Sequence, residues 1–286
     1  MGLDQKGSLN QSQKLMIFVL SMSLYGLAML FTELIPKLQV GIVEFSVEYF
    51  AFIPLTLCML FDPLSAAIGA ATGEVIFSEI MLGQFGGFGE VEKFVLFALG
   101  MYVAGLMVKN PKNKVQVGIA AITGVAIHQI LACGVDILKV QFAIEEFETV
   151  AGLPESVWLT EGFAMLNDIV FSGILFCMIP TMYLVPKLHG KIEPLLGMKP
   201  RTKEDKISMG SIFSPKLLAV AVSSFILAVG FEFMAETGIN IIDWEASWAE
   251  SVPAMMMGIA VAAIISIGLI GMLFSRRNKT LKTQVD

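Results

Sequence analysis

The chain has 286 residues, of which 56% are hydrophobic and 15% are charged; its mean hydropathy is +0.76 and its formal net charge is −6. Soluble globular domains carry roughly 25% charged residues, so the composition excludes an ordinary soluble protein and predicts a polytopic membrane protein. The three cysteines all lie in apolar runs, which indicates buried thiols rather than a disulfide framework.

Apolar runs of about 20 residues are long enough to cross a bilayer as helices. After a polar segment, 1–13, the sequence predicts an all-α fold, a polytopic membrane helix bundle of about eight transmembrane helices. No small-residue cleavage site follows the first run, so we expect an anchor helix rather than a removed signal peptide. The helices are predicted at 14–35, 49–61, 63–83, 93–108, 115–137, 161–186, 216–236 and 253–274.

The basic segment 187–215 is the clearest internal boundary. It divides a six-helix substrate-binding bundle, 14–186, from a two-helix C-terminal extension, 216–274, which is followed by a short tail, 275–286.

The cations are distributed unevenly between alternate loops. With the N-terminus in the cytoplasm, 16 of the 19 Lys and Arg residues lie in inner segments, and only Lys37, Lys93 and Lys139 lie outside. The positive-inside rule therefore predicts a multi-pass protein of the cell membrane with both termini in the cytoplasm. The inner cations are most simply this orientation signal, with attraction to membrane lipid headgroups as a second interpretation.

Several acidic residues lie within the predicted helices. A carboxylate at the centre of a membrane helix costs about 2.5–3.5 kcal/mol on insertion scales, so such residues usually face a cavity or a partner. Glu161 and Asp168 share one face of the sixth helix, and Gln129 and Asp136 share one face of the fifth, because residues advance by 100° around a helix. Glu74 lies close to mid-membrane in the third helix.

These positions predict an outward-opening polar cavity among the third, fifth and sixth helices. The candidate substrate-binding residues are Glu74, Asp168, Glu79, His128, Gln129, Asp136 and Glu161, with Glu48 from the first outer loop. Two alternatives stay open: Glu79, Asp136 and Glu161 can be interface residues with their carboxylates in water, and His128 can be a packing residue.

Small residues recur along two helices. Ser65, Gly69 and Gly73 have four-residue spacing in the third helix, which permits close helix contact. Ser23 and Gly26 give the first helix a looser small face. Both sets suit docking of a partner protein or packing within one chain.

The three outer segments, 36–50, 83–93 and 139–160, are rich in aromatic residues and predict a lid over the cavity. The sequence contains no P-loop, HExxH or GxSxG motif, so it gives no support for an enzyme or a cofactor. It has only two histidines, on opposite sides of the membrane, which excludes a His-rich metal site, and it has no basic patch suited to nucleic acid.

The stretch "FAFIPLTLCMLFDPLSAAIGAATGEVIFSEIML", 50–82, resembles the second and third helices of the substrate-binding S components of energy-coupling-factor (ECF) transporters. The turn Phe61-Asp62-Pro63 and the pair Gly73-Glu74 carry the likeness, and 94–110 is similar to the family's fourth helix. This chain differs by its two additional C-terminal helices and by Asp62 in place of the usual glycine.

The resemblance implies capture of a small-molecule micronutrient from outside, in a pocket capped by the first outer loop. It also implies a membrane scaffold subunit and cytoplasmic ATPase subunits as partners. The acidic residues lead us to expect a cationic or hydrogen-bond-donating ligand. The alternatives are a proton- or cation-coupled secondary transporter that uses the same carboxylates, and a non-transporting membrane scaffold.

Overall fold

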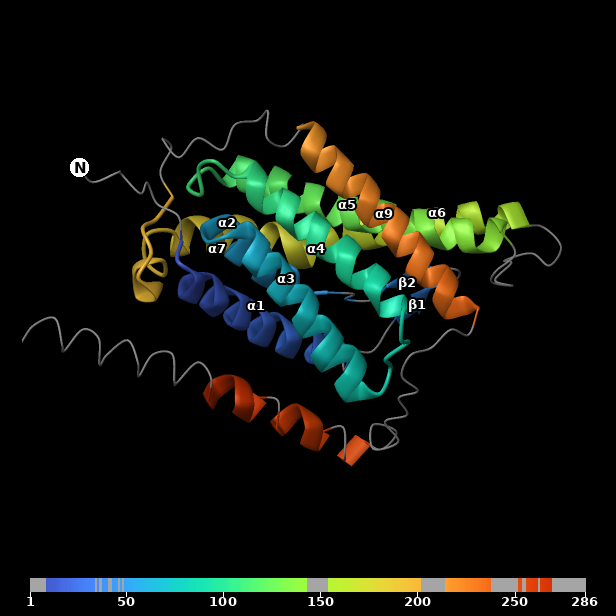
Figure 1. Ribbon diagram of the computed structural model, residues 1–286, viewed down its shortest axis with the longest axis horizontal. Helices are drawn as coiled ribbons and strands as arrows, with labels where there is room; N and C mark the ends of the chain where they lie inside the picture. The colour runs from blue at the N-terminus through green and yellow to red at the C-terminus, as the bar shows by residue number, and fades with distance from the viewer. Residues whose placement is uncertain are drawn as a thin grey trace, which may run out of the picture.

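The computed structural model of the chain is predominantly helical (Figure 1). It describes residues 9–33, 35, 38–40, 43–45, 47, 49–142, 154–201, 214–237, 252–253, 256–261 and 263–268. The first half contains α1 (Gln11–Thr32), β1 (Leu38–Val40), β2 (Val43–Phe45), α2 (Phe52–Leu60), α3 (Pro63–Glu74), η1 (Val75–Ile80), α4 (Gly89–Met107) and α5 (Lys114–Gln141). The second half contains η2 (Pro154–Ser156), α6 (Val157–Asn167), η3 (Asp168–Met178), α7 (Ile179–Leu188), η4 (Pro194–Leu196) and α9 (Pro215–Glu236).

Helix ends follow the local sequence chemistry. The Asn10 side chain accepts a hydrogen bond from the Gln13 amide at the start of α1, and Asn113 does the same for the first amides of α5. Asp62 caps α3, with Pro63 at the first helical position. These caps explain why α1 and α5 begin one to three residues before the predicted 14 and 115.

Within the described residues, four helical segments are long and apolar enough to cross a membrane, which confirms the prediction of a helical membrane protein at this level. They are Gln11–Thr32, Lys114–Gln141, Val157–Leu188 and Pro215–Glu236. The other predicted spans differ from such a helix: α2 has only nine residues, 63–83 divides between α3 and the π-helical η1, and α4 begins with charged residues. Of 253–274, the described residues form helical turns within 253–268.

Helices α1 and α3 pack at very short range. A Cβ atom at Gly69 would lie 2.3 Å from the Phe18 carbonyl oxygen, and one at Gly73 would lie 2.2 Å from that of Met22. The Ser21 hydroxyl donates a hydrogen bond to the Ala66 carbonyl oxygen at 2.7 Å. Backbone contact of this kind requires glycine.

The segment predicted as the first outer loop contains a short hairpin within an otherwise helical fold. Residues 38–40 and 43–45 pair as an antiparallel hairpin, with Leu38 opposite Phe45. The hairpin contacts α6, so part of this loop is folded against the bundle.

Helix α9 packs against α4 and α5. Its Ala228 is fully buried against Leu96 of α4 and Val135 of α5. Phe231 packs beside Phe88 with ring centroids 5.4 Å apart, and Phe233 packs edge-on to Phe142. Figure 1 shows α9 crossing the layer formed by α4 and α5.

Candidate functional site

Aromatic and polar side chains, three of them buried and two half-buried, gather between α1, α4 and α5. This central cluster consists of Tyr25, Tyr49, Phe97, His128 and Gln129. The Tyr25 ring stacks on Phe97 with centroids 5.0 Å apart, and His128 meets Phe97 edge-on at 5.5 Å. Gln129 donates a hydrogen bond to the Tyr49 hydroxyl at 2.9 Å, and the Tyr49 ring lies edge-on to His128.

The central cluster joins three helices to the segment that precedes α2. Tyr25 comes from α1, Phe97 from α4, and His128 and Gln129 from α5. Tyr49 comes from the end of the segment between β2 and α2, which is predicted as the first outer loop, and is only 5% exposed. That loop therefore inserts a side chain into the bundle directly over two of the predicted site residues.

The Tyr25 hydroxyl is a buried polar group with no hydrogen-bond partner in the part of the chain that the structure describes. Buried hydroxyls are usually paired, so such a group needs a specific explanation, such as a ligand or a bound water. The charge of Glu74 acts electrostatically on Tyr25.

Both mid-helix acids predicted as site residues lie where a helix changes geometry. Glu74 is the last residue of α3 before the π-helical η1, and Asp168 is the first residue of the π-helical η3. Wider helical turns of this type occur frequently at functional sites. Asp168 accepts a hydrogen bond from Asn167 at 3.4 Å. The charges of Glu79, Lys93, Glu90 and Glu33 act electrostatically on Glu74.

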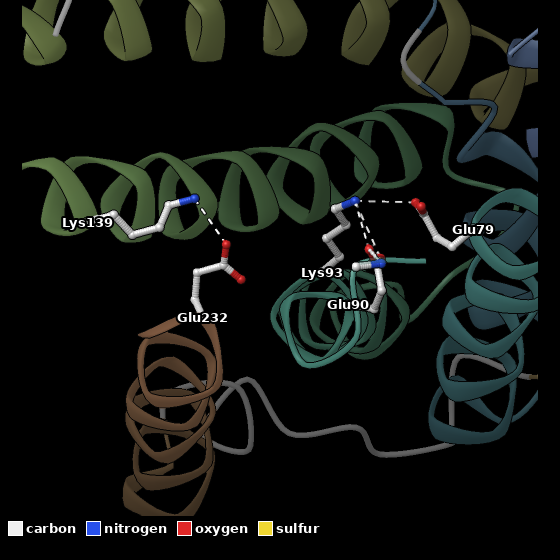
Figure 2. A network of polar contacts seen from close by, with 6 residues as sticks. Glu79, Glu90, Lys93, Lys139 and Glu232 are labelled. Carbon is white, nitrogen blue, oxygen red and sulfur yellow. Dashed lines mark hydrogen bonds and ion pairs between the residues drawn. The ribbon is translucent and has the colours of Figure 1, made fainter. Parts of the chain in front are cut away.

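Lys93 joins two buried carboxylates from different segments. Its Nζ lies 3.3 Å from Glu79 Oε1 of η1 and 3.4 Å from Glu90 of α4 (Figure 2). Glu90 Oε1 also accepts a hydrogen bond from the Gly86 amide at 3.2 Å. The glycine-rich turn makes this possible because Gly83 and Gly87 adopt positive φ.

Lys139 makes the equivalent connection between α5 and α9. Its Nζ lies 3.0 Å from Asp136 and 3.1 Å from Glu232, and its side chain is only 11% exposed. Figure 2 shows Lys139 and Glu232 reaching toward each other from these two helices. We call the six residues of both groups, Glu79, Glu90, Lys93, Asp136, Lys139 and Glu232, the outer ion-pair network.

Glu92 interacts electrostatically with both halves of this network, through Asp136, Glu232, Lys139 and Lys93. Its Oε1 is buried and has no hydrogen-bond partner among the described residues. Together with Glu74, the outer ion-pair network contains more carboxylates than lysines, so its formal charge is negative.

The sequence reasoning found part of this arrangement. Glu79 and Asp136, predicted to line a cavity or to lie with their carboxylates in water, each have a lysine partner. Glu161 and Asp136 both act electrostatically on Cys133, as expected if the fifth and sixth helices face each other here. Glu48 lies outside the described residues.

The network residues Glu90, Lys93, Lys139 and Glu232 and the cluster residues Tyr25 and Tyr49 were missed. One available signal was that Lys93 and Lys139 are exceptions to the positive-inside pattern. A lysine predicted on the outer side can depart from the positive-inside pattern when buried acidic side chains pair with it.

The small residues predicted to dock a partner pack within the chain. A Cβ at Gly26 would lie 2.8 Å from the Gly73 carbonyl oxygen, and Ser23 is 1% exposed. Ser65 donates its hydroxyl to the Asp62 carboxylate at 2.6 Å as part of the α3 cap. The interpretation as packing within one chain therefore accounts for these positions.

No group of three or more His, Cys, Asp or Glu side chains that could hold a metal ion occurs within the described ranges.

Comparison with known proteins gives one match. The model of a family described as "Family of unknown function (DUF8171)" matches residues 16–284. No curated protein and no solved structure matches the chain. The family match begins in α1 and extends beyond the last described helical turn. The protein therefore belongs to this family of unknown function, DUF8171.

Proposed function

We propose that this protein is a solute-capture subunit of a membrane uptake system, of the ECF S-component type. The observation that carries the proposal is the folding of the first outer loop onto the bundle. Tyr49 contacts His128 and Gln129, Glu74 acts electrostatically on Tyr25, and the Tyr25 hydroxyl has no hydrogen-bond partner among the described residues. A capture protein needs this combination of buried polar groups and a covering loop that can move.

The proposed ligand is a small micronutrient with a cationic or hydrogen-bond-donating group. The excess of carboxylates over lysines around Glu74 supports this chemistry, because a buried uncompensated charge is costly without a partner. Aromatic faces at Tyr25 and Phe97 also suit a cationic group. Release on the inner side would depend on a membrane scaffold subunit and cytoplasmic ATPase subunits.

The proposed topology has about eight spans, with both termini in the cytoplasm of a plasma-membrane protein. The cation distribution supports this orientation. Lys93 and Lys139, two of the three cations on the outer side, are ion-paired with acidic side chains and so do not weigh against it.

A thermal-shift screen of the purified chain against water-soluble vitamins and amines tests ligand capture. A ligand at 100 times its Kd stabilises the folded state by about 2.7 kcal/mol, which is readily seen as a higher Tm. Glu74→Gln and His128→Ala should remove the shift. Glu155→Gln, which changes an exposed carboxylate, should keep it. A shift that persists unchanged in both site variants would contradict the assignment of the site.

The outer ion-pair network favours a second candidate, a proton- or cation-coupled secondary transporter. Buried carboxylates and lysines within membrane helices commonly mark ion and proton pathways. Proteoliposomes that contain the purified chain alone distinguish the candidates. Uptake of the screened ligand driven by a pH or ion gradient supports the secondary transporter, whereas uptake that requires ATP and partner subunits supports the capture subunit.

A further inference from the structure

The segment after α7 is a folded element rather than a plain basic loop. We call residues 189–201 the inner cap. Its Glu193 is fully buried, accepts a hydrogen bond from the Gly190 amide at 2.8 Å and lies 3.0 Å from His189 Nδ1. Met198 is 7% exposed and joins the main hydrophobic core. Figure 1 shows this part of the chain at one end of the bundle, beside the start of α1.

Arg201 ends the inner cap and reaches between two helices. Its guanidinium donates hydrogen bonds to the carbonyl oxygens of Gly105 at 3.1 Å and Cys58 at 3.2 Å, and also to that of Phe61. Cys58 and Phe61 lie at the C-terminal end of α2, and Gly105 lies in the last turn of α4.

The two helix ends are suited to a single guanidinium. A Cβ at Gly105 would lie 2.8 Å from the Cys58 carbonyl oxygen, so glycine brings the two backbones into contact. Carbonyl groups in the last turn of a helix lack intrahelical partners and carry partial negative charge. The planar guanidinium has five donors and can satisfy several carbonyls at once, whereas a lysine is a compact point charge.

The inner cap is also bound to the first helix. Gln13 of α1 donates a hydrogen bond to the Gly197 carbonyl oxygen at 2.8 Å. The cap therefore connects the start of α1 with the ends of α2 and α4. The neighbouring Lys199 is exposed, as expected for a cation that serves only as an orientation signal.

We propose that the inner cap is a cytoplasmic gate and that Arg201 is its latch. The latch consists of polar bonds to backbone carbonyls, which water can replace when the cap moves away. Opening would release the ends of α2 and α4 and expose Cys58, which is fully buried beneath them. This inference goes beyond the proposed function. It uses only the proposed orientation of the chain in the membrane, because a site that is loaded from outside needs to be closed at its inner end.

Thiol labelling of the purified full-length chain tests the gate without any ligand, so its outcome is independent of the capture proposal. The probe is a charged, water-soluble maleimide, and mass spectrometry reports the labelling rate of each native cysteine. Arg201→Ala should label Cys58 at least about tenfold faster than the unchanged chain, which corresponds to about 1.4 kcal/mol in the opening equilibrium. Arg201→Lys should fall between the two, and the control Lys199→Ala should match the unchanged chain.

Cys177 serves as an internal reference, because it is fully buried and its Sγ lies 3.8 Å from the Tyr49 carbonyl oxygen, away from the inner cap. Faster labelling of Cys58 alone supports the gate. An unchanged Cys58 rate in Arg201→Ala overturns it. An equal rise at Cys58 and Cys177 also overturns it, because Arg201 would then hold the whole bundle together rather than one end.

Discussion

The charged residues of this protein act through specific partners rather than as isolated charges. Lys139 is the clearest case, because it connects Asp136 on its own helix with Glu232 on α9 and is largely removed from water. Removal of one member of a buried pair is far more damaging than replacement of the pair, since the remaining charge stays buried without compensation.

Lys139→Met should therefore destabilise the protein by about 3–5 kcal/mol, the range observed when one partner of a buried ion pair is removed. Thermal unfolding of the purified chain measures this as a lower Tm. Lys114→Met, which changes an exposed cation on the same helix, is the matched control and should have little effect. The double variant Lys139→Met with Glu232→Leu should recover most of the loss; no recovery would contradict a role as a pair.

The variant Tyr25→Phe tests ligand binding separately from the stability of the folded protein. Because its hydroxyl has no partner among the described residues, Tyr25→Phe should keep the Tm of the ligand-free protein or raise it slightly. Loss of one hydrogen bond to a bound ligand should weaken affinity by about tenfold. Titration of the ligand found in the screen measures this, and an unchanged Kd would exclude the Tyr25 hydroxyl as a ligand contact.

At the level of helices, packing depends on a few small residues that allow backbones to touch. Gly73→Ala places a methyl group 2.2 Å from the Met22 carbonyl oxygen, so α1 and α3 must move apart. We expect a loss of about 1–3 kcal/mol, as for other overpacked sites. Gly162→Ala in α6, where nothing lies within 4 Å of the added Cβ, should instead be neutral or stabilising by up to about 1 kcal/mol. Equal Tm changes for both variants would contradict the packing argument.

Helix positions could be predicted from sequence because they depend on local signals. Hydropathy located the apolar segments, and Asp62-Pro63 and the Gly83–Gly89 turn located their boundaries. Contacts between distant residues could not be predicted in this way. Nothing in the pattern pairs Lys139 with Glu232 or Arg201 with Cys58, since these contacts depend on how α9 and the inner cap dock.

The residues of the candidate site could likewise be predicted from sequence only in part. Glu74, His128 and Gln129 were identifiable because polar residues in apolar helices are expensive. Tyr25 and Tyr49 were not, because tyrosines also occur at membrane interfaces for unrelated reasons. The short hairpin at 38–45 was hidden by its three-residue strands, which are too short to give an alternating pattern.

For the molecule as a whole, the proposed topology makes a direct prediction. With an even number of spans, a green fluorescent protein fused to the C-terminus should fluoresce, and an alkaline phosphatase fused there should be inactive, because both ends lie in the cytoplasm. The same reporters fused after Gln141 in α5 should give the opposite result. An active phosphatase at the C-terminus would contradict the orientation and the inner position of the cap.

The central claim is that the buried cluster beneath the first outer loop binds a small solute. Native mass spectrometry of the chain purified from its own membrane tests it most directly. We predict a bound small molecule in the unchanged protein, its loss in Glu74→Gln and a smaller bound fraction in Tyr25→Phe, while the exposed-site variant Glu155→Gln retains it. A protein that carries no small molecule under any condition, or one that carries the same bound fraction in both cluster variants, would contradict the account.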